Sequence, residues 1–440
     1  MAEQAKRASV GGASRRRFLK TSAAVVSLSA LGGLDISRSA YAQGNEVIRI
    51  GVIGCGGRGP GAAMNAMNVD PGVRLVAMAD LFEERVRAQR EALKQQKPQQ
   101  VAVDDAHCFA GFDAYRHVIE SVDVVIIANA AKFHPFHLRA AVEAGKHVFV
   151  EKPHAIDPAG VREVSAACEL AKQKKLCVVS GLQSRYHTGY RETMQRIHDG
   201  AIGEIVAVEE NFLRAPYGLY GRKPGMPEVQ YQCSNQYHFN WLSGDDVPQS
   251  LVHNLDRTTW ALREQPPVRA HGLGGRSSSF DEIYGNVFDH HSVVYQYASG
   301  ARVYAFCRTE VGCYDENSSI IMGTKGRCDL MQMRIEGETN WRYDGPGCNP
   351  YDEEHRALFA AIRAGEPINS GDYMARSTLV CVMGQLACYT GKEITWDQVE
   401  KSEFYYPPRP QDCSFDMDPP VKPDANGRYP VPVPGVTKMI

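Results

Sequence analysis

The sequence lacks several features that define large protein classes. Its twelve cysteines include no Cys-x-x-Cys pair and no Cys/His spacing typical of a zinc finger, so no metal site is expected. It has little net charge, −2 from 49 basic and 51 acidic residues, which argues against nucleic acid as a partner. The apolar stretch at residues 23–34 is too short to span a bilayer as a permanent helix. What is present is a chain of 440 residues, enough for two globular domains with sizeable cores.

The cysteines are scattered along the chain, and most are expected to be buried thiols. Two pairs are close enough in sequence for a disulfide to be considered, Cys307/Cys313 and Cys381/Cys388. Spacing alone does not establish either pairing, because a disulfide also needs the two Cβ atoms to meet.

Residues 1–42 resemble a twin-arginine (Tat) export signal. An arginine run leads into Phe18-Leu19-Lys20, an apolar stretch follows, and Ala40-Tyr41-Ala42 fits a cleavage site. The resemblance implies that the Tat translocase exports the protein folded, to the periplasm or the medium, with any cofactor loaded beforehand in the cytoplasm. The alternative is an arginine-rich disordered tail. This segment holds seven basic residues against two acids, which leaves −7 for the rest of the chain.

A glycine-rich loop follows the first predicted strand, at residues 47–53. The strand is rich in branched apolar residues, as in parallel strands buried on both faces. Here the order strand, glycine loop, helix is typical of a dinucleotide-binding turn, in which backbone amides approach a pyrophosphate. The residues expected to hold the cofactor in this loop are Gly54, Gly56, Gly57, Arg58 and Gly59.

A second apolar strand, at residues 73–79, ends in Asp80, about 26 residues after Gly54. A carboxylate there accepts hydrogen bonds from ribose hydroxyls and repels a 2′-phosphate, which favours NAD over NADP. The nearby Arg58 and Arg85 leave NADP open. The alternative to the whole motif is a structural turn in which Asp80 caps a helix.

Further strands are predicted at residues 122–127 and 147–150, with a helix at about 135–144 between them. This βαβ rhythm predicts an α/β fold whose first domain is a doubly wound parallel sheet. The last strand runs into Glu151-Lys152-Pro153, at the carboxyl edge of the sheet where such folds bind ligands.

The stretch Ala144-Gly145-Lys146-His147 and the Glu151-Lys152-Pro153 that follows, together with the glycine loop, resemble the glucose-fructose oxidoreductase/inositol dehydrogenase/MocA (Gfo/Idh/MocA) family. The resemblance continues through residues 181–186 and 253–256 and covers nearly all of the chain after the signal. It implies a second, α+β domain with an open, mostly antiparallel sheet, and segments 205–213, 287–297 and 302–308 read as its strands. The expected divisions are residues 1–42, 43–155, 156–404 and a proline-rich arm at 405–440.

The resemblance also implies the catalytic residues. Lys152 is expected near the nicotinamide and the reacting hydroxyl, and His253 as the general base, with Asp256 orienting the site. The family pattern Asp-x-x-x-His-x-x-Asp is broken at its first position by Gln249, which can form hydrogen bonds but cannot ion-pair with Lys152. Asp245 or Asp246 could supply the missing carboxylate, or could lie in a solvated turn or helix cap.

The other expected contacts are weaker. His134 and Glu151 are expected beside the cofactor, the alternative for His134 being the start of a helix. Arg185, Tyr186 and Tyr237 are expected near the substrate, the alternatives being a structural salt bridge for Arg185 and aromatic packing for Tyr237. His290 and His291 would point to opposite faces of a strand, so they would not form a metal pair.

These features predict a periplasmic NAD-dependent oxidoreductase that oxidises a secondary hydroxyl of a sugar, glycoside or cyclitol, as a homo-oligomer, with its cofactor retained between turnovers. Two alternatives stay open. One is an enzyme that cleaves glycosides through a transient oxidation. The other is a non-catalytic binding protein stabilised by NAD, which the substitution at Gln249 keeps open. The arm, with nine of the 24 prolines, is expected to be neither regular helix nor central strand.

Overall fold

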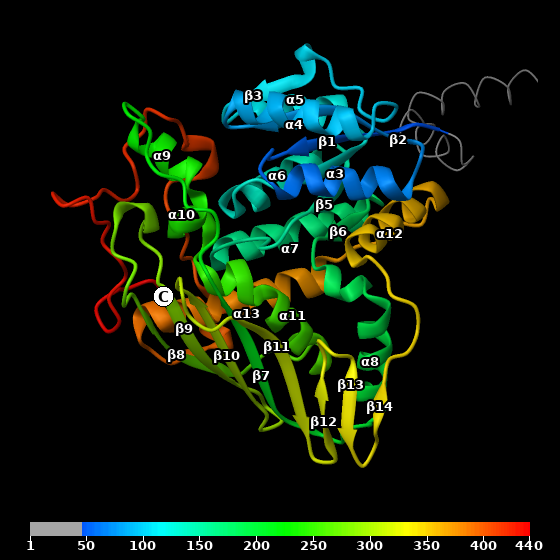
Figure 1. Cartoon of the computed structure of the whole chain (residues 1–440), viewed down its shortest axis with the longest axis vertical. Coiled ribbons are helices and arrows are strands. Elements are labelled where there is room, and N and C mark those ends of the chain that lie inside the picture. Colours follow the sequence, from blue (N-terminus) through cyan, green and yellow to red (C-terminus); the bar gives the residue numbers. More distant parts are fainter. Residues whose placement is uncertain (1–45) are drawn as a thin grey trace, which may run out of the picture.

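The computed structural model describes residues 46–440 as two sheets with helices around and between them (Figure 1). The segment that resembles a Tat signal, residues 1–42, lies outside the described residues. In the described part of the chain, no helix combines the length and the apolar character needed to cross a membrane.

The first sheet has six parallel strands in the order β3-β2-β1-β4-β5-β6. One core cluster packs beneath α3 and α4, and another packs beneath α5, α6 and α7, so helices cover both faces. The predicted doubly wound sheet is confirmed. Its elements are β1 (Ile48–Ile53), α3 (Arg58–Val69), β2 (Val73–Asp80), α4 (Glu83–Gln96), β3 (Cys108–Ala110), α5 (Ala114–Ser121), β4 (Val124–Ile127), α6 (His134–Glu143), β5 (His147–Val150), α7 (Pro158–Gln173) and β6 (Val178–Ser180).

The first sheet continues beyond the expected domain boundary at residue 155. After α7, the chain returns to add β6 beside β5, where Val178, Val179 and Ser180 are fully buried. The short strand was missed because three residues before a glycine carry no periodic signal. The long α12 (Pro350–Ala364) also packs on α3, so the late chain contributes to the nucleotide-binding half.

The second sheet has nine strands in the order β14-β13-β12-β11-β7-β10-β9-β8-β15. Every neighbouring pair is antiparallel except β10 and β7, which confirms the expected open, mostly antiparallel sheet. Its strands are β7 (Ile205–Arg214), β8 (Arg269–Gly275), β9 (His290–Gln296), β10 (Arg302–Thr309), β11 (Glu316–Gly323), β12 (Gly326–Asp329), β13 (Arg334–Gly337), β14 (Trp341–Arg342) and β15 (Ile394–Thr395).

Two buried helices join the sheets. In Figure 1, α13 (Gly371–Thr390) lies between α7 and the second sheet, and it contacts α7, β8 and β9. Beside it, α11 (Val252–Ala261) packs on β7 and β11 and carries His253. The first helix of the second half, α8 (Thr188–His198), contacts α11 in turn. This packing brings His253 to the carboxyl edge of the first sheet.

The proline-rich arm packs against the protein. Figure 1 shows it beside α9 (Glu228–Ser234) and α10 (Asn240–Ser243). As expected, residues 405–440 contain neither α-helix nor strand. The ring of Phe415 lies 5.1 Å from that of Phe112 and 6.0 Å from that of Phe82, on the nucleotide-binding half. The arm therefore covers one side of that half rather than hanging free.

All twelve cysteines are free thiols. Cys381 and Cys388 lie seven residues apart on α13, about 10 Å along the axis, which is too far for a disulfide. Cys307 is buried, with its sulfur 3.5 Å from Nδ1 of His291, whereas Cys313 is exposed.

Candidate active site

The glycine loop after β1 contains glycines with two different tasks. A side chain on Gly59 would put its Cβ 1.9 Å from the carbonyl oxygen of Gly54. Gly54 has φ +103°, and a Cβ there would lie 2.4 Å from the backbone nitrogen of Asn129. The fold itself thus requires both glycines. Gly56 and Gly57 face open space, with nothing within 4 Å of an added Cβ. Their bare backbone, at the N-terminus of α3, suits close approach by a phosphate.

Asp80 closes the other side of this loop. One carboxylate oxygen accepts a 2.7 Å hydrogen bond from the Cys55 backbone N–H, and the other accepts a 3.1 Å bond from that of Phe82. Arg85 reaches to 3.9 Å, and burial raises the pKa of the Asp80 carboxyl. The loop and Asp80 line a cleft of about 310 Å³, whose donors and single buried carboxylate fit the pyrophosphate and ribose of a dinucleotide.

A second cavity, of about 440 Å³, adjoins this nucleotide cleft. We call it the inner cavity. Lys152, which follows β5, and Gln249 and His253, four residues apart on the π-helical turn and the start of α11, all line it. The residues that line both spaces are Arg58, Ala128, Asn129, Gln236 and Tyr237. A ligand in the inner cavity would therefore lie against the inner end of a nucleotide in the cleft.

Lys152 contacts the backbone of Gln249 rather than its side chain. Its ammonium Nζ donates a 2.7 Å hydrogen bond to the carbonyl oxygen of Gln249. That carbonyl belongs to a π-helical turn, Val247–Leu251, which precedes α11 and departs from regular α-helical bonding. A backbone oxygen thus occupies the place where the family pattern implies a carboxylate. The Gln249 side chain is buried, and its Oε1 has no hydrogen-bond partner.

His253 lies on the first turn of α11 and lines the inner cavity. Its Nδ1 is buried without a hydrogen-bond partner. Burial holds the pKa of His253 well below its ordinary value, and the positive charges of Lys152 and Arg257 lower it further. The imidazole is consequently neutral near pH 7, the state in which it can accept a proton.

Asp256 and Arg185 satisfy each other away from the cavity, so the roles expected of them are corrected. Arg185 Nη2 lies 2.8 Å from Asp256 Oδ1, and Arg185 Nη1 lies 2.6 Å from Glu264. Ser377 donates a further 2.8 Å hydrogen bond to Asp256. A buried carboxylate with this many donors is a structural anchor for α11, and neither residue lines the cavity.

The motif around Arg185 still contributes to the cavity through its neighbours. Residues 183–186 form a 3-10 turn, which directs Gln183 and Ser184 inward. Tyr186 is not among the lining residues, although it was expected there, and Arg191 lies over its ring at 5.3 Å. The sequence therefore predicted that residues 181–186 lie near the site, but the 3-10 turn determines which of their side chains reach the cavity. Tyr237, by contrast, lies on both spaces.

Neither Asp245 nor Asp246 replaces the missing carboxylate. Asp245 is fully enclosed and accepts hydrogen bonds from Tyr389 at 2.5 Å and from the Phe288 backbone N–H at 2.8 Å. Asp246 pairs with Arg214 at 2.6 Å. Both carboxylates are held away from Lys152, because the left-handed Gly244 turn and the π-helical turn separate them from it.

His134 and Glu151 hold the walls of the inner cavity. The two imidazole nitrogens of His134 lie 2.8 Å from the Pro153 carbonyl oxygen and 2.9 Å from that of Asn129, so the neutral ring donates to one of these carbonyls and both nitrogens face the protein backbone rather than a cofactor. Burial lowers the pKa of His134. Glu151 pairs with Arg58, which also lies 3.3 Å from Glu354. Arg58, which lines both spaces, and Glu151, which lines the inner cavity, thus form one ion-paired wall rather than two independent contacts.

Several polar atoms of the inner cavity are buried without a partner, and the sequence did not single out most of their residues. A buried polar atom left unpaired costs about 1–3 kcal/mol, so a group of them around one cavity marks a site that a polar ligand completes. No sequence motif marks Asn129, Gln236 or Arg257, and Gln183 was not singled out within the segment 181–186 that carries part of the family resemblance. The unpartnered atoms are Asn129 Oδ1, Gln183 Oε1, Gln236 Oε1, Gln249 Oε1, His253 Nδ1 and Arg257 Nη2.

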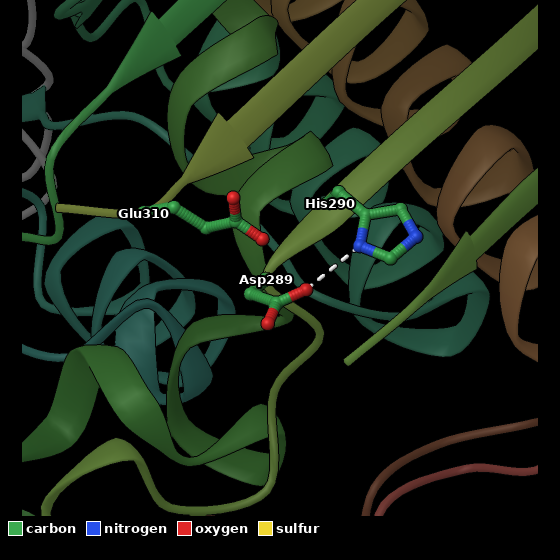
Figure 2. Close-up of side chains that lie close together, drawn as sticks. All are labelled: Asp289, His290 and Glu310. Carbon is green, nitrogen blue, oxygen red and sulfur yellow. Dashed lines mark hydrogen bonds and ion pairs between the residues drawn. The ribbon is translucent and has the colours of Figure 1, made fainter. Parts of the chain in front are cut away.

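One group of potential metal ligands lies outside both spaces. Figure 2 shows Asp289, His290 and Glu310 together, with Nδ1 of His290 2.7 Å from Asp289 Oδ1. Asp289 Oδ2 already accepts a 2.8 Å hydrogen bond from the Ser277 backbone N–H. His291 points to the opposite, buried face of β9, as predicted from strand alternation.

Comparison with known proteins gives a consistent result. A sequence model described as "Oxidoreductase family, NAD-binding Rossmann fold" matches residues 48–182. The chain is 28% identical to a myo-inositol 2-dehydrogenase of Thermotoga maritima over 73% of its own length and 90% of that protein. It is 25% identical to a glycosyl hydrolase family 109 protein of Shewanella amazonensis over 73% of its own length and 69% of that protein. An aldose-aldose oxidoreductase structure from Caulobacter crescentus shares the fold, with a TM-score of 0.62 and 20% identity over 80% of this chain and 100% of that one.

Proposed function

Because the chain belongs to the Gfo/Idh/MocA family of NAD(P)-dependent oxidoreductases acting on CH–OH groups, we propose that it oxidises a secondary hydroxyl of a sugar, glycoside or cyclitol to a ketone. The observation that carries the proposal is the convergence of Lys152, Gln249 and His253 on a cavity that shares its wall with the nucleotide cleft. A polyol in the inner cavity would meet unpartnered amide oxygens that accept bonds from its hydroxyls.

The residues divide the chemistry between them. The lowered pKa of His253 keeps its imidazole unprotonated, so it is available to accept the proton of the reacting hydroxyl. The ammonium of Lys152, oriented by the Gln249 carbonyl, donates to the oxygen as negative charge develops on it. When bound, NAD supplies the acceptor for the hydride that leaves the same carbon. Arg58 and Glu151 form the wall where the two spaces meet.

We also propose that NAD is preferred over NADP. The carboxylate of Asp80 would bind ribose hydroxyls and repel a 2′-phosphate. Arg85 is the opposing feature, since its guanidinium lies 4.4 Å from the Phe82 ring centroid within the same cleft. Competition between NAD and NADP for cofactor-free protein tests this. Tighter binding of NAD in the wild type, lost in Asp80→Ala, is expected, and an unchanged preference would show that Asp80 does not set it.

We propose periplasmic action with a retained cofactor, on the strength of the Tat-like segment at residues 1–42. A protein exported folded carries its nucleotide with it, and a second sugar would then reoxidise that nucleotide in place. A fusion of residues 1–42 to a folded reporter tests export, with a paired Arg16→Lys and Arg17→Lys variant as the control that should stay in the cytoplasm.

The first experiment is the absorbance and mass spectrum of the purified mature protein after denaturation. Stoichiometric release of NAD(H) supports a retained cofactor. Reduction of bound NAD is then followed at the nicotinamide absorbance across a panel of sugars and cyclitols. A protein that contains no nucleotide, binds none when it is added, and reduces none with any sugar would refute the oxidoreductase.

A second candidate is glycoside cleavage through transient oxidation. The similarity to the glycosyl hydrolase family 109 protein favours testing it. Product analysis separates the two reactions. A keto-sugar with its glycosidic bond intact supports the first proposal, and free aglycone without net reduction of NAD supports the second.

A further inference from the structure

Arg257 is a buried guanidinium that makes no direct ion pair with a described residue. It is 3% exposed and lines the inner cavity. Its Nε donates a 2.9 Å hydrogen bond to the Ser319 hydroxyl, while Nη2 has no hydrogen-bond partner. Among residues 46–440, no carboxylate lies within ion-pairing distance of it. Buried charges are ordinarily paired, because removing a charge from water is costly.

Two arginines near this region show the usual arrangement. Arg58 also lines the inner cavity, but it pairs with Glu151 and Glu354. Arg185, on the 3-10 turn of residues 183–186 that contacts α11, pairs with Asp256 and Glu264. Each of these guanidiniums is engaged by two carboxylates of the protein. Arg257 is the buried arginine on the cavity that is left for a ligand.

The carboxyl linked to Arg257 only partly balances its charge. Ser319 accepts from Arg257 and donates to Glu210, so a hydroxyl separates the two charged groups. Thr258 donates a 2.7 Å bond and Asn254 a 2.9 Å bond to the same carboxyl. Burial raises the pKa of Glu210 to about 7, which weakens its tendency to carry a full negative charge opposite Arg257.

The position of Arg257 relates it to the reacting hydroxyl. It follows His253 by four residues on α11, so the two side chains emerge from the same face of the helix, one turn apart. A ligand that places a hydroxyl at His253 would therefore present a substituent several ångströms away to Arg257.

We propose that the natural substrate is a sugar acid whose carboxylate is bound by Arg257, and that Arg257 selects it over the corresponding neutral sugar. This inference rests on the proposed function and names its substrate class. A planar guanidinium with free Nη groups matches the two oxygens of a carboxylate. A single guanidinium balances one negative charge, which favours a carboxylate over a phosphate dianion.

Calorimetric binding to the NAD-loaded mature protein tests the inference independently of turnover. The probes are methyl glycosides in matched pairs, glucuronide with glucoside, galacturonide with galactoside and mannuronide with mannoside, and glucose 6-phosphate as the dianion. At least one acid is expected to bind at least tenfold tighter than its neutral partner. The inference is overturned if no acid does so, or if the phosphate binds tighter than every acid.

Variants then assign the preference to the residue. Arg257→Gln is expected to abolish the difference within the pair, and Arg257→Lys to retain part of it. If the single variant is unstable, the double variant Glu210→Gln/Arg257→Gln replaces it in this measurement, because it removes both charged groups of the buried network and leaves neither without its partner. Arg196→Gln, on the half-exposed outer face of α8, is the matched control. A preference that survives in folded Arg257→Gln would overturn the assignment.

The two proposals fail differently. If a sugar acid binds through Arg257 but no sugar reduces the bound NAD, the oxidoreductase is refuted and the acid site stands. If neutral sugars reduce NAD as well as their acids do and bind as tightly, the oxidoreductase stands and the acid site is refuted.

Discussion

The nucleotide cleft and the inner cavity share a wall, but they differ in how their polar groups are satisfied. In the described residues that line only the cleft, no buried side-chain polar atom lacks a partner. Asp80 illustrates this, because backbone amides bind both of its oxygens. Four residues that line only the inner cavity each carry an unpartnered buried atom: Gln183, Gln249, His253 and Arg257.

The difference indicates two modes of recognition. A cofactor common to many enzymes can be bound by bare backbone and one carboxylate, and these features are stable without it. A specific polyol requires side chains whose hydrogen bonds are completed only by that ligand. Changes in the inner cavity should therefore alter catalysis and specificity, and changes in the glycine loop should alter folding or cofactor affinity.

The largest effect is expected for Lys152→Met. The ammonium is removed, the apolar stem is kept, and kcat should fall about 10³-fold because charge on the reacting oxygen is no longer stabilised. Turnover is measured by nicotinamide absorbance with the best sugar of the panel. Lys172→Met, at an exposed surface position, is the control. A loss below tenfold would remove Lys152 from the chemistry.

His253→Asn should lower kcat/KM about 10²-fold. In the wild type the folded-state pKa of His253 is lowered, so its neutral, proton-accepting form persists as the pH falls through the ordinary histidine value of about 6.5. The kcat/KM profile should therefore stay level from pH 8 to about 6.5 and fall only at more acidic pH. An acidic limb of the kcat/KM profile with its midpoint at pH 6.5 or above would contradict the assignment of His253 as the proton acceptor.

Two glycines of one loop should separate folding from binding. Gly59→Ala places a methyl 1.9 Å from a carbonyl oxygen, and it should destabilise the fold by about 1–3 kcal/mol or more. Gly56→Ala meets no protein atom within 4 Å, so its melting temperature should hold while NAD affinity falls about tenfold. Thermal melts and NAD titrations measure both. If the two variants behaved alike, Gly56 would not face the nucleotide.

The smallest effect is expected for Gln249→Ala. Lys152 is held by the backbone carbonyl of residue 249, which the substitution keeps. Only the unpartnered amide is lost, so KM should rise about 2–10-fold with kcat little changed. A kcat loss as large as that of Lys152→Met would instead mean that the Gln249 side chain supports the proton transfer.

The sequence predicted the nucleotide-binding half better than the rest, for a physical reason. Its strands are continuous apolar runs and its loop needs glycine at fixed spacing, so both are visible as local patterns. The strand at residues 147–150 has the predicted bounds, and the helix predicted at about 135–144 begins at His134. The outer strands β12, β13 and β14, of two to four residues, have no such pattern and went unpredicted.

The sequence by itself determined the family, the α/β class and the segments that supply Lys152, Gln249 and His253, because these depend on local motifs and hydrophobic periodicity. Only the tertiary structure decided which atoms those segments present. It turned Asp256 and Arg185 toward each other, met Lys152 with a backbone oxygen, and left Arg257 facing the inner cavity without a carboxylate. These contacts join residues that are distant in sequence and meet only when the helices and sheets pack. Because burying an unpaired charge is costly, a buried charged group is usually placed beside a group that compensates it.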